Sequence, residues 1–127
     1  MTGLRRIRIR LGALELVADL GDSPTADALW RALPVTGEAQ RWGDEVYFRV
    51  PLHVDGAPDA REEMAVGELG FWPVGDAFCI FFGPTPVSRA GEPRAYSPVN
   101  PFGRIDGDPR VLGAVADGDA VAVEALE

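Results

Sequence analysis

Residues 6–16 read Arg-Ile-Arg-Ile-Arg-Leu-Gly-Ala-Leu-Glu-Leu, and this stretch indicates a β-rich fold. Polar and apolar side chains alternate on both sides of the central Gly-Ala pair, which is the two-residue period of a β-strand. If that pair forms a two-residue turn, four pairs face each other across a hairpin: Leu11 with Leu14, Arg10 with Glu15, Ile9 with Leu16, and Arg6 with Asp19. One face is then apolar and the other pairs opposite charges, each pair contributing roughly 0.2–1 kcal/mol. The arginine stripe is therefore interpreted as a solvated sheet face, not as a ligand site.

The segments that follow predict more short strands and two helices. Residues 23–33 have a helical spacing of apolar side chains, a serine cap and a proline at the first helical position. A second helix is predicted from Asp108 to about Val115. Further strands are predicted in 35–51 around a Gly43-Asp44 turn, in 62–82 as two or three strands, in 99–105 with a bulge or edge at Pro101, and in 120–126. Residues 52–61 and 83–98 are predicted loops, the second with four prolines and unusually long for a compact domain.

The order of these elements predicts the architecture. Two isolated helices beside about eight short strands do not fit a parallel sheet. They fit a mainly β, closed, eight-stranded antiparallel barrel with a short helix capping each end. Residues 78–82 are apolar on both faces, so this strand is expected at the centre of the sheet. At 127 residues the chain is expected to form one domain, 1–127.

Composition excludes several classes of function. The net charge of −8 argues against nucleic-acid binding, which needs a basic face. Every basic residue is arginine, so Schiff-base chemistry and lysine-dependent phosphate loops are excluded. No apolar run is long enough to span a membrane, and no signal peptide is recognised. With a single cysteine we expect a cytoplasmic protein without disulfides.

Three segments together are characteristic of a known family. They are Trp-Gly-Asp-Glu-Val-Tyr-Phe at 42–48, Gly-Glu-Leu-Gly-Phe-Trp-Pro at 67–73, and Phe-Phe-Gly-Pro-Thr-Pro at 81–86. The sequence resembles the small prokaryotic cyclophilin-like proteins, long grouped as a domain of unknown function, over nearly its whole length. The resemblance implies a cyclophilin-type eight-stranded barrel with two helices. It also implies a candidate activity, because residues 47–51 resemble the segment that carries the catalytic arginine of the cyclophilins. The Gln-Gly-Gly-Asp and Met-Ala-Asn-Ala segments of those isomerases are absent.

Two functional hypotheses follow. The first is a non-catalytic module that binds a small molecule or an extended peptide between the outer barrel face and the 83–98 loop. Its candidate ligand-binding residues are Tyr47, Phe71, Phe82, Thr85, Asn100 and Arg104. Arg49 or Arg104 would suit a ligand carboxylate. The second is a weak prolyl isomerase with Arg49 as the hydrogen-bond donor and Phe48, Phe71 and Phe82 as slot walls. A homo-oligomer or a subunit of a larger enzyme is also consistent with the family.

The remaining candidates have structural interpretations. His53 and Cys79 are single representatives of their types, so no zinc site or cysteine–histidine catalytic pair is expected, and no cofactor. His53 is expected in a loop and Cys79 in the core. Acidic pairs such as Glu62-Glu63 and Asp117/Asp119 fit strand faces and turns. Residues 83–86 are either a rigid exit from a central strand or one wall of a cleft.

Overall fold

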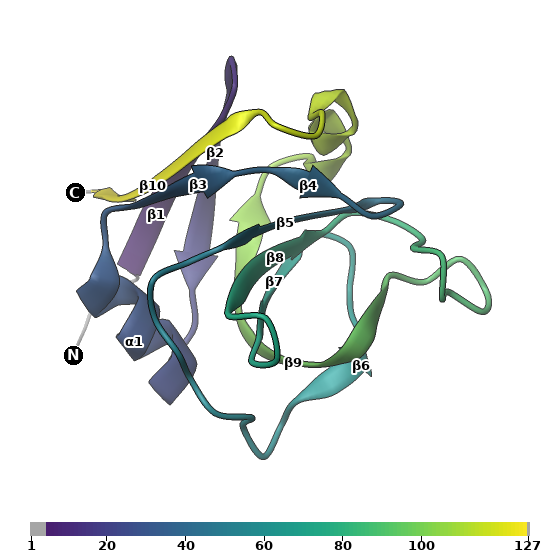
Figure 1. The fold of residues 1–127 in the computed structure, drawn as a ribbon, viewed down its shortest axis with the longest axis horizontal. Helices are drawn as coiled ribbons and strands as arrows, with labels where there is room; N and C mark the ends of the chain where they lie inside the picture. The colour runs from purple at the N-terminus through teal and green to yellow at the C-terminus, as the bar shows by residue number, and fades with distance from the viewer. Residues whose placement is uncertain (1–4, 127) are drawn as a thin grey trace.

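The computed structural model describes residues 5–126, which form ten strands and two short helices (Figure 1). The strands are β1 (Arg5–Leu11), β2 (Leu14–Leu20), β3 (Val35–Glu38), β4 (Gln40–Arg41), β5 (Glu45–Arg49), β6 (Arg61–Glu63), β7 (Glu68–Trp72), β8 (Ala77–Phe81), β9 (Arg94–Asp106) and β10 (Ala120–Leu126). The helices are α1 (Pro24–Ala32) and the 3-10 helix η1 (Pro109–Ala114). All strand pairs are antiparallel, which confirms the predicted mainly β class.

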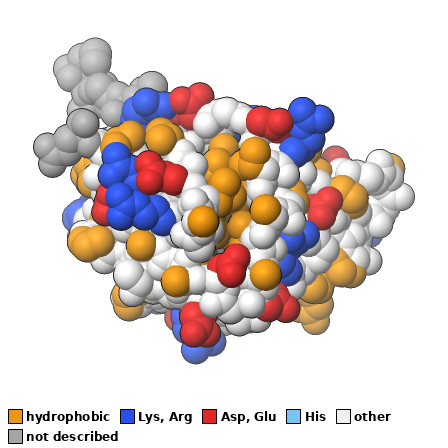
Figure 2. All heavy atoms as spheres, turned by 90° about the horizontal axis from the view of Figure 1, so that it is seen from above, with side chains coloured by type: hydrophobic (Ala, Val, Ile, Leu, Met, Phe, Trp, Pro, Cys, Tyr) orange, Lys and Arg blue, Asp and Glu red, His pale blue; other side chains and the backbone are white. Residues whose placement is uncertain are grey.

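The hairpin of β1 and β2 has the predicted register. Leu11 lies opposite Leu14, and Arg6 lies opposite Asp19. The Arg6 Nε donates a 2.8 Å hydrogen bond to Asp19, and Arg8 adds a 2.7 Å bond to Glu124 of β10. The stripe is therefore a paired, solvated face, as predicted. On the face drawn in Figure 2, basic and acidic side chains likewise lie beside one another, with hydrophobic side chains between them.

Both helices begin where the sequence predicts. The Ser23 hydroxyl accepts a 3.1 Å hydrogen bond from the amide of Ala26, which caps α1. Asp108 caps η1 by accepting a 3.0 Å bond from the amide of Arg110. Each helix places apolar side chains in the core, Ala26 and Leu29 from α1 and Leu112 from η1.

The predicted closed eight-stranded barrel is not confirmed. The hydrogen-bonded order is β3-β10-β1-β2-β9-β7-β8-β5-β4, with β6 paired to β9 outside this path, and bonds within residues 5–126 do not close it. The two ends of the order, β3 and β4, are consecutive in the chain and separated only by Ala39. The Ala39 amide donates to the carbonyl of Asp119 at 2.8 Å, which continues the pairing of β3 with the β10 side of the sheet. The observed architecture is a ten-stranded antiparallel sheet.

Strand β9 is longer than predicted and accounts for part of the predicted loop. It begins at Arg94, whereas the prolines of 83–98 predicted a loop up to residue 98. Proline is tolerated here because β9 changes partner along its length, pairing first with β6, then with β7, and finally with β2. The register shifts beside Pro101, which confirms the predicted bulge. Figure 1 shows β9 curving below β7 and β8 to reach β6.

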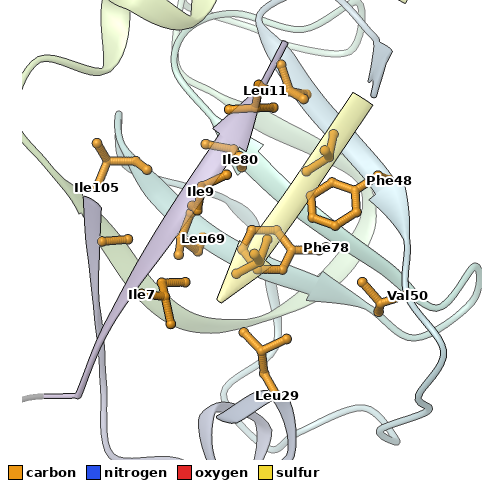
Figure 3. Packing of buried hydrophobic residues seen from close by; sticks show 14 of the residues in the cluster. Ile7, Ile9, Leu11, Leu29, Phe48, Val50, Leu69, Phe78, Ile80 and Ile105 are labelled. Atoms are coloured by element: carbon orange, nitrogen blue, oxygen red, sulfur yellow. The ribbon is translucent and has the colours of Figure 1, made fainter. Parts of the chain in front are cut away.

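Two apolar clusters lie on opposite faces of β8. All five residues of β8 are buried, as predicted for a central strand. Phe78 and Ile80 enter the main core, where the Phe48 and Phe78 rings stack with centroids 4.8 Å apart (Figure 3). Cys79 and Phe81 point to a smaller second cluster, completed by Met64, Ala77, Ala95 and Val99. The first segment of β9 covers this second face.

Candidate functional site

A cavity of about 240 Å³ lies at the second cluster, between the outer face of β5 and β8 and the first half of β9. It is lined by Trp42, Glu45, Tyr47, Trp72, Cys79, Ala95, Tyr96 and Val99. Seven of these side chains are apolar, aromatic or a thiol, and one is a carboxylic acid. The cavity is just smaller than typical ligand pockets of roughly 300–1,000 Å³, so its size suits a small ligand.

Strand alternation places Glu45 in this cavity. Glu45 and Tyr47 lie on the outer face of β5, while Val46 and Phe48 lie on the face of the main core. Glu45 is buried, with only 6% of the residue exposed to solvent. Within residues 5–126, no arginine or histidine forms an ion pair with it. Glu45 is therefore a buried acid without a cationic partner.

Burial changes the protonation chemistry of Glu45 and its neighbour Cys79. Loss of hydration raises the pKa of the Glu45 carboxyl to about 7, and a hydrogen bond from the Cys79 thiol offsets part of that rise. Burial, together with the adjacent Glu45 charge, raises the pKa of the Cys79 thiol well above its usual value. The Cys79 Sγ also lies 3.8 Å from the carbonyl oxygen of Ala77. The pair thus offers a carboxyl with a pKa of about 7 beside a buried thiol.

Three aromatic rings meet at the cavity mouth. The ring centroids of Tyr96 and Trp42 are 6.1 Å apart, and those of Tyr96 and Trp72 are 6.2 Å apart. Both pairs are edge-to-face, with interplanar angles of 75° and 86°. The Trp72 Nε1 donates a 2.6 Å hydrogen bond to the Ser97 hydroxyl, which fixes this indole against β9. Tyr96 is 71% exposed, so it forms the rim of the cavity.

The characteristic sequence segments build the cavity by packing against each other. The β4–β5 turn has Gly43 at a φ of 60°, and a Cβ there would lie 2.9 Å from the Cα of Thr85. The Asp44 amide donates a 2.9 Å hydrogen bond to the carbonyl of Pro84. This close approach of the 42–48 and 81–86 segments helps to hold Trp42 and Glu45 in the cavity lining.

Comparison with known proteins identifies the family. The model of the cyclophilin-like family matches residues 5–124. The chain belongs to the cyclophilin-like family. The solution structure of a hypothetical protein from Archaeoglobus fulgidus is similar, with a TM-score of 0.82 and 36% sequence identity, over 97% of this chain and 95% of that one. No curated protein matches the sequence.

Of the six residues predicted to bind a ligand, this cyclophilin-like structure places Tyr47 in the cavity. Phe71 and Phe82 belong to the main core. The guanidinium carbon of Arg41 also lies 5.1 Å from the centroid of the Phe82 ring. Arg104 is exposed on β9, opposite Glu68.

Thr85 and Asn100 have internal hydrogen-bond partners. Thr85 is buried, and its hydroxyl donates to the carbonyl of Arg94, which ties the 83–86 segment to the start of β9. No residue of 83–86 lines the cavity. The Asn100 side chain is fully buried and bonds to the Ala57 amide at 2.8 Å and the Asp55 carbonyl at 2.9 Å.

Arg49 lies on the same face of β5 as Tyr47 but outside the cavity. Its side chain is exposed, and it pairs in register with Ala77 of β8. The proposed slot walls Phe48, Phe71 and Phe82 all lie in the main core. The isomerase arrangement of an arginine beside an apolar slot is therefore not assembled from these residues.

The candidate residues chosen from the sequence do not include the cavity residues Glu45, Trp42, Trp72 and Tyr96. Alternation along β5 was a usable signal for Glu45, because it sets this acid on the face of Tyr47. Tyr96 had no local signal, since it lies in a proline-rich segment predicted as a loop.

The other titratable candidates lie elsewhere. His53 lies in the loop after β5, as predicted, with its ring nitrogens 2.6 Å from Asp76 and 2.9 Å from Asp55. Both hydrogen bonds raise the pKa of His53, and the bond to Asp76 has the larger effect.

Among residues 5–126 no three His, Cys, Asp or Glu side chains lie close enough together to bind a metal ion. No helix in the same range has the length and apolar character to cross a bilayer.

Proposed function

We propose that this cyclophilin-like domain is a non-catalytic module that binds a small molecule in the cavity between β5, β8 and β9. The proposal rests on Glu45. Its carboxyl lines a cavity with aromatic walls and has no cationic partner within residues 5–126. Burying an acid without a partner costs stability, so such a group is more common at functional sites than in ordinary cores.

The cavity has the composition of a ligand site. Apolar and aromatic walls contribute most of the binding energy, and one polar group orients the ligand. The indole of Trp72 is held by Ser97, and Trp42 is held by the turn that packs on 83–86, so the walls are formed before a ligand arrives. A small occupant is favoured over an extended peptide because the cavity holds only about 240 Å³.

The chain contains a built-in reporter for this proposal. Two of its three tryptophans, Trp42 and Trp72, line the cavity, whereas Trp30 lies on α1. A Trp30→Phe protein would therefore report only the cavity in fluorescence, and its indole N–H signals would be two in number. A fragment library screened against this protein should give hits that shift both signals.

A cavity-filling variant supplies the control. Ala95 lines the cavity and is 3% exposed, so Ala95→Leu would occupy part of the space at a cost of about 1–3 kcal/mol. Circular dichroism would establish that the variant is folded. Loss of binding in Ala95→Leu supports the proposal. Hits that leave Trp42 and Trp72 unchanged, or that bind both proteins equally, would contradict it.

A further inference from the structure

We infer that the ligand of this cavity is a small organic cation whose charge lies on an alkylated ammonium group. The inference rests on the proposed function, because it assigns a chemical class to the occupant of the same site. It is carried by two independent features, the aromatic rings at the mouth and the single acid within.

The rings offer the surfaces that alkylated ammonium ions prefer. The ring of Tyr96 is nearly perpendicular to that of Trp42, at 75°, and to that of Trp72, at 86°. A cation over the face of tryptophan or tyrosine is attracted by the ring quadrupole, most strongly where water is excluded. Alkylated ammonium ions also lose less hydration than a primary amine, and their methyl groups pack on apolar walls.

The acid complements the cation. Glu45 is the only carboxylic acid among the lining residues, and none of them is arginine or histidine. An anion would meet this carboxyl without any cationic partner, which argues against the carboxylate ligand expected from Arg49 or Arg104. Both arginines lie outside the cavity lining.

The charge of the whole chain acts in the same direction. A net charge of −8 raises the local concentration of cations around the protein and lowers that of anions. The effect is weak at physiological salt, where the screening length is about 8 Å, but it has the sign that the cavity requires.

The test compares choline with 3,3-dimethyl-1-butanol, in which carbon replaces the quaternary nitrogen. The two probes have the same shape, so the difference between them measures the charge. Titrations use the full chain carrying Trp30→Phe, followed by indole fluorescence and N–H shifts. Choline should bind at least about tenfold more tightly than the neutral alcohol, as expected for a desolvated cation–π site.

Variants separate the contributions of charge and rings. Glu45→Gln should weaken choline and leave the alcohol unchanged, whereas Glu68→Gln, outside the cavity, should change neither. Tyr96→Leu, at an exposed position that does not threaten folding, should weaken choline several-fold. Choline affinity in the unmodified chain should also rise between about pH 6 and pH 8 as Glu45 ionises. The other titratable groups that line the cavity are the Cys79 thiol and the hydroxyls of Tyr47 and Tyr96.

The outcomes distinguish this inference from the proposed function. Equal affinities for choline and the alcohol would overturn the cation assignment and leave a neutral binding site. Failure of choline while neutral fragments bind would do the same. Failure of every probe and fragment would overturn the proposed function itself.

Discussion

Replacing Glu45 by glutamine should make the protein more stable at neutral pH. Burial raises the pKa of Glu45 from its ordinary value of 4.5 to about 7. Between these values the folded state binds a proton that the unfolded state has released, so the free energy of unfolding falls as pH rises. Above about pH 7 the carboxyl is ionised in both states, and the loss in the free energy of unfolding has reached its full value. With 1.36 kcal/mol for each pKa unit, that loss is about 3 kcal/mol.

The variant keeps the shape of the side chain and removes its ionisation. The free energy of unfolding of Glu45→Gln, minus that of the parent, should therefore rise by up to about 3 kcal/mol from about pH 5 to about pH 8. Urea unfolding followed by circular dichroism at several pH values measures this difference. Other titrating groups cancel because both proteins contain them.

Glu68→Gln is the matched control. Burial would raise the pKa of Glu68, but hydrogen bonds from Arg61 and the Ala65 amide outweigh it and lower the pKa. Because the pKa of Glu68 is lower in the folded state than the value of 4.5 in the unfolded state, its contribution to stability is present above pH 4.5 and is lost only at lower pH. Glu68→Gln should thus be destabilising by a constant amount across the same range. A difference for Glu45→Gln that stays flat between about pH 5 and pH 8 would refute the desolvation of Glu45.

Three further predictions concern residues singled out by the sequence. Asn100→Ala should lower the free energy of unfolding by about 2–3 kcal/mol in urea titrations, because it leaves buried partners unpaired, while ligand binding in the cavity persists. Cys79 should react slowly with iodoacetamide at neutral pH in the folded protein and rapidly in urea, as mass spectrometry would record; fast labelling of the folded protein would contradict its burial. Catalytic amounts of the protein should leave proline cis/trans exchange in a test peptide unchanged by NMR; acceleration that disappears in Arg49→Ala would instead restore the isomerase hypothesis.

Local pattern predicted the elements whose environment depends on near neighbours. The β1–β2 register follows from alternation and a two-residue turn, and both were correct. The caps at Ser23 and Asp108 were also correct, because a cap is satisfied within a few residues of the chain. The central position of β8 followed from its apolar residues on both faces.

Long-range pairing was harder to predict. The start of β9 at Arg94 depends on β6, a three-residue strand more than thirty positions earlier in the chain. The prolines of this segment favoured a loop, and only a partner that spares their missing N–H groups makes a strand possible. Most of the cavity lining was not predicted for the same reason, since β9 supplies its outer wall. Alternation could set Glu45 beside Tyr47, but not show what covered them.

Two acids are buried within residues 5–126, and they differ in a way that supports the functional role proposed for one of them. Glu68 is 8% exposed and Glu45 is 6% exposed, so both are removed from water to a similar extent. Glu68 has Arg61 and the Ala65 amide as donors, a structural solution to the cost of burial. Within residues 5–126, Glu45 has only the Cys79 thiol as a donor, although β5 could carry an apolar side chain at this position. Burial raises the pKa of Glu45, and this acid lines the same cavity as three aromatic rings. Both features support the proposal that a ligand completes its pairing.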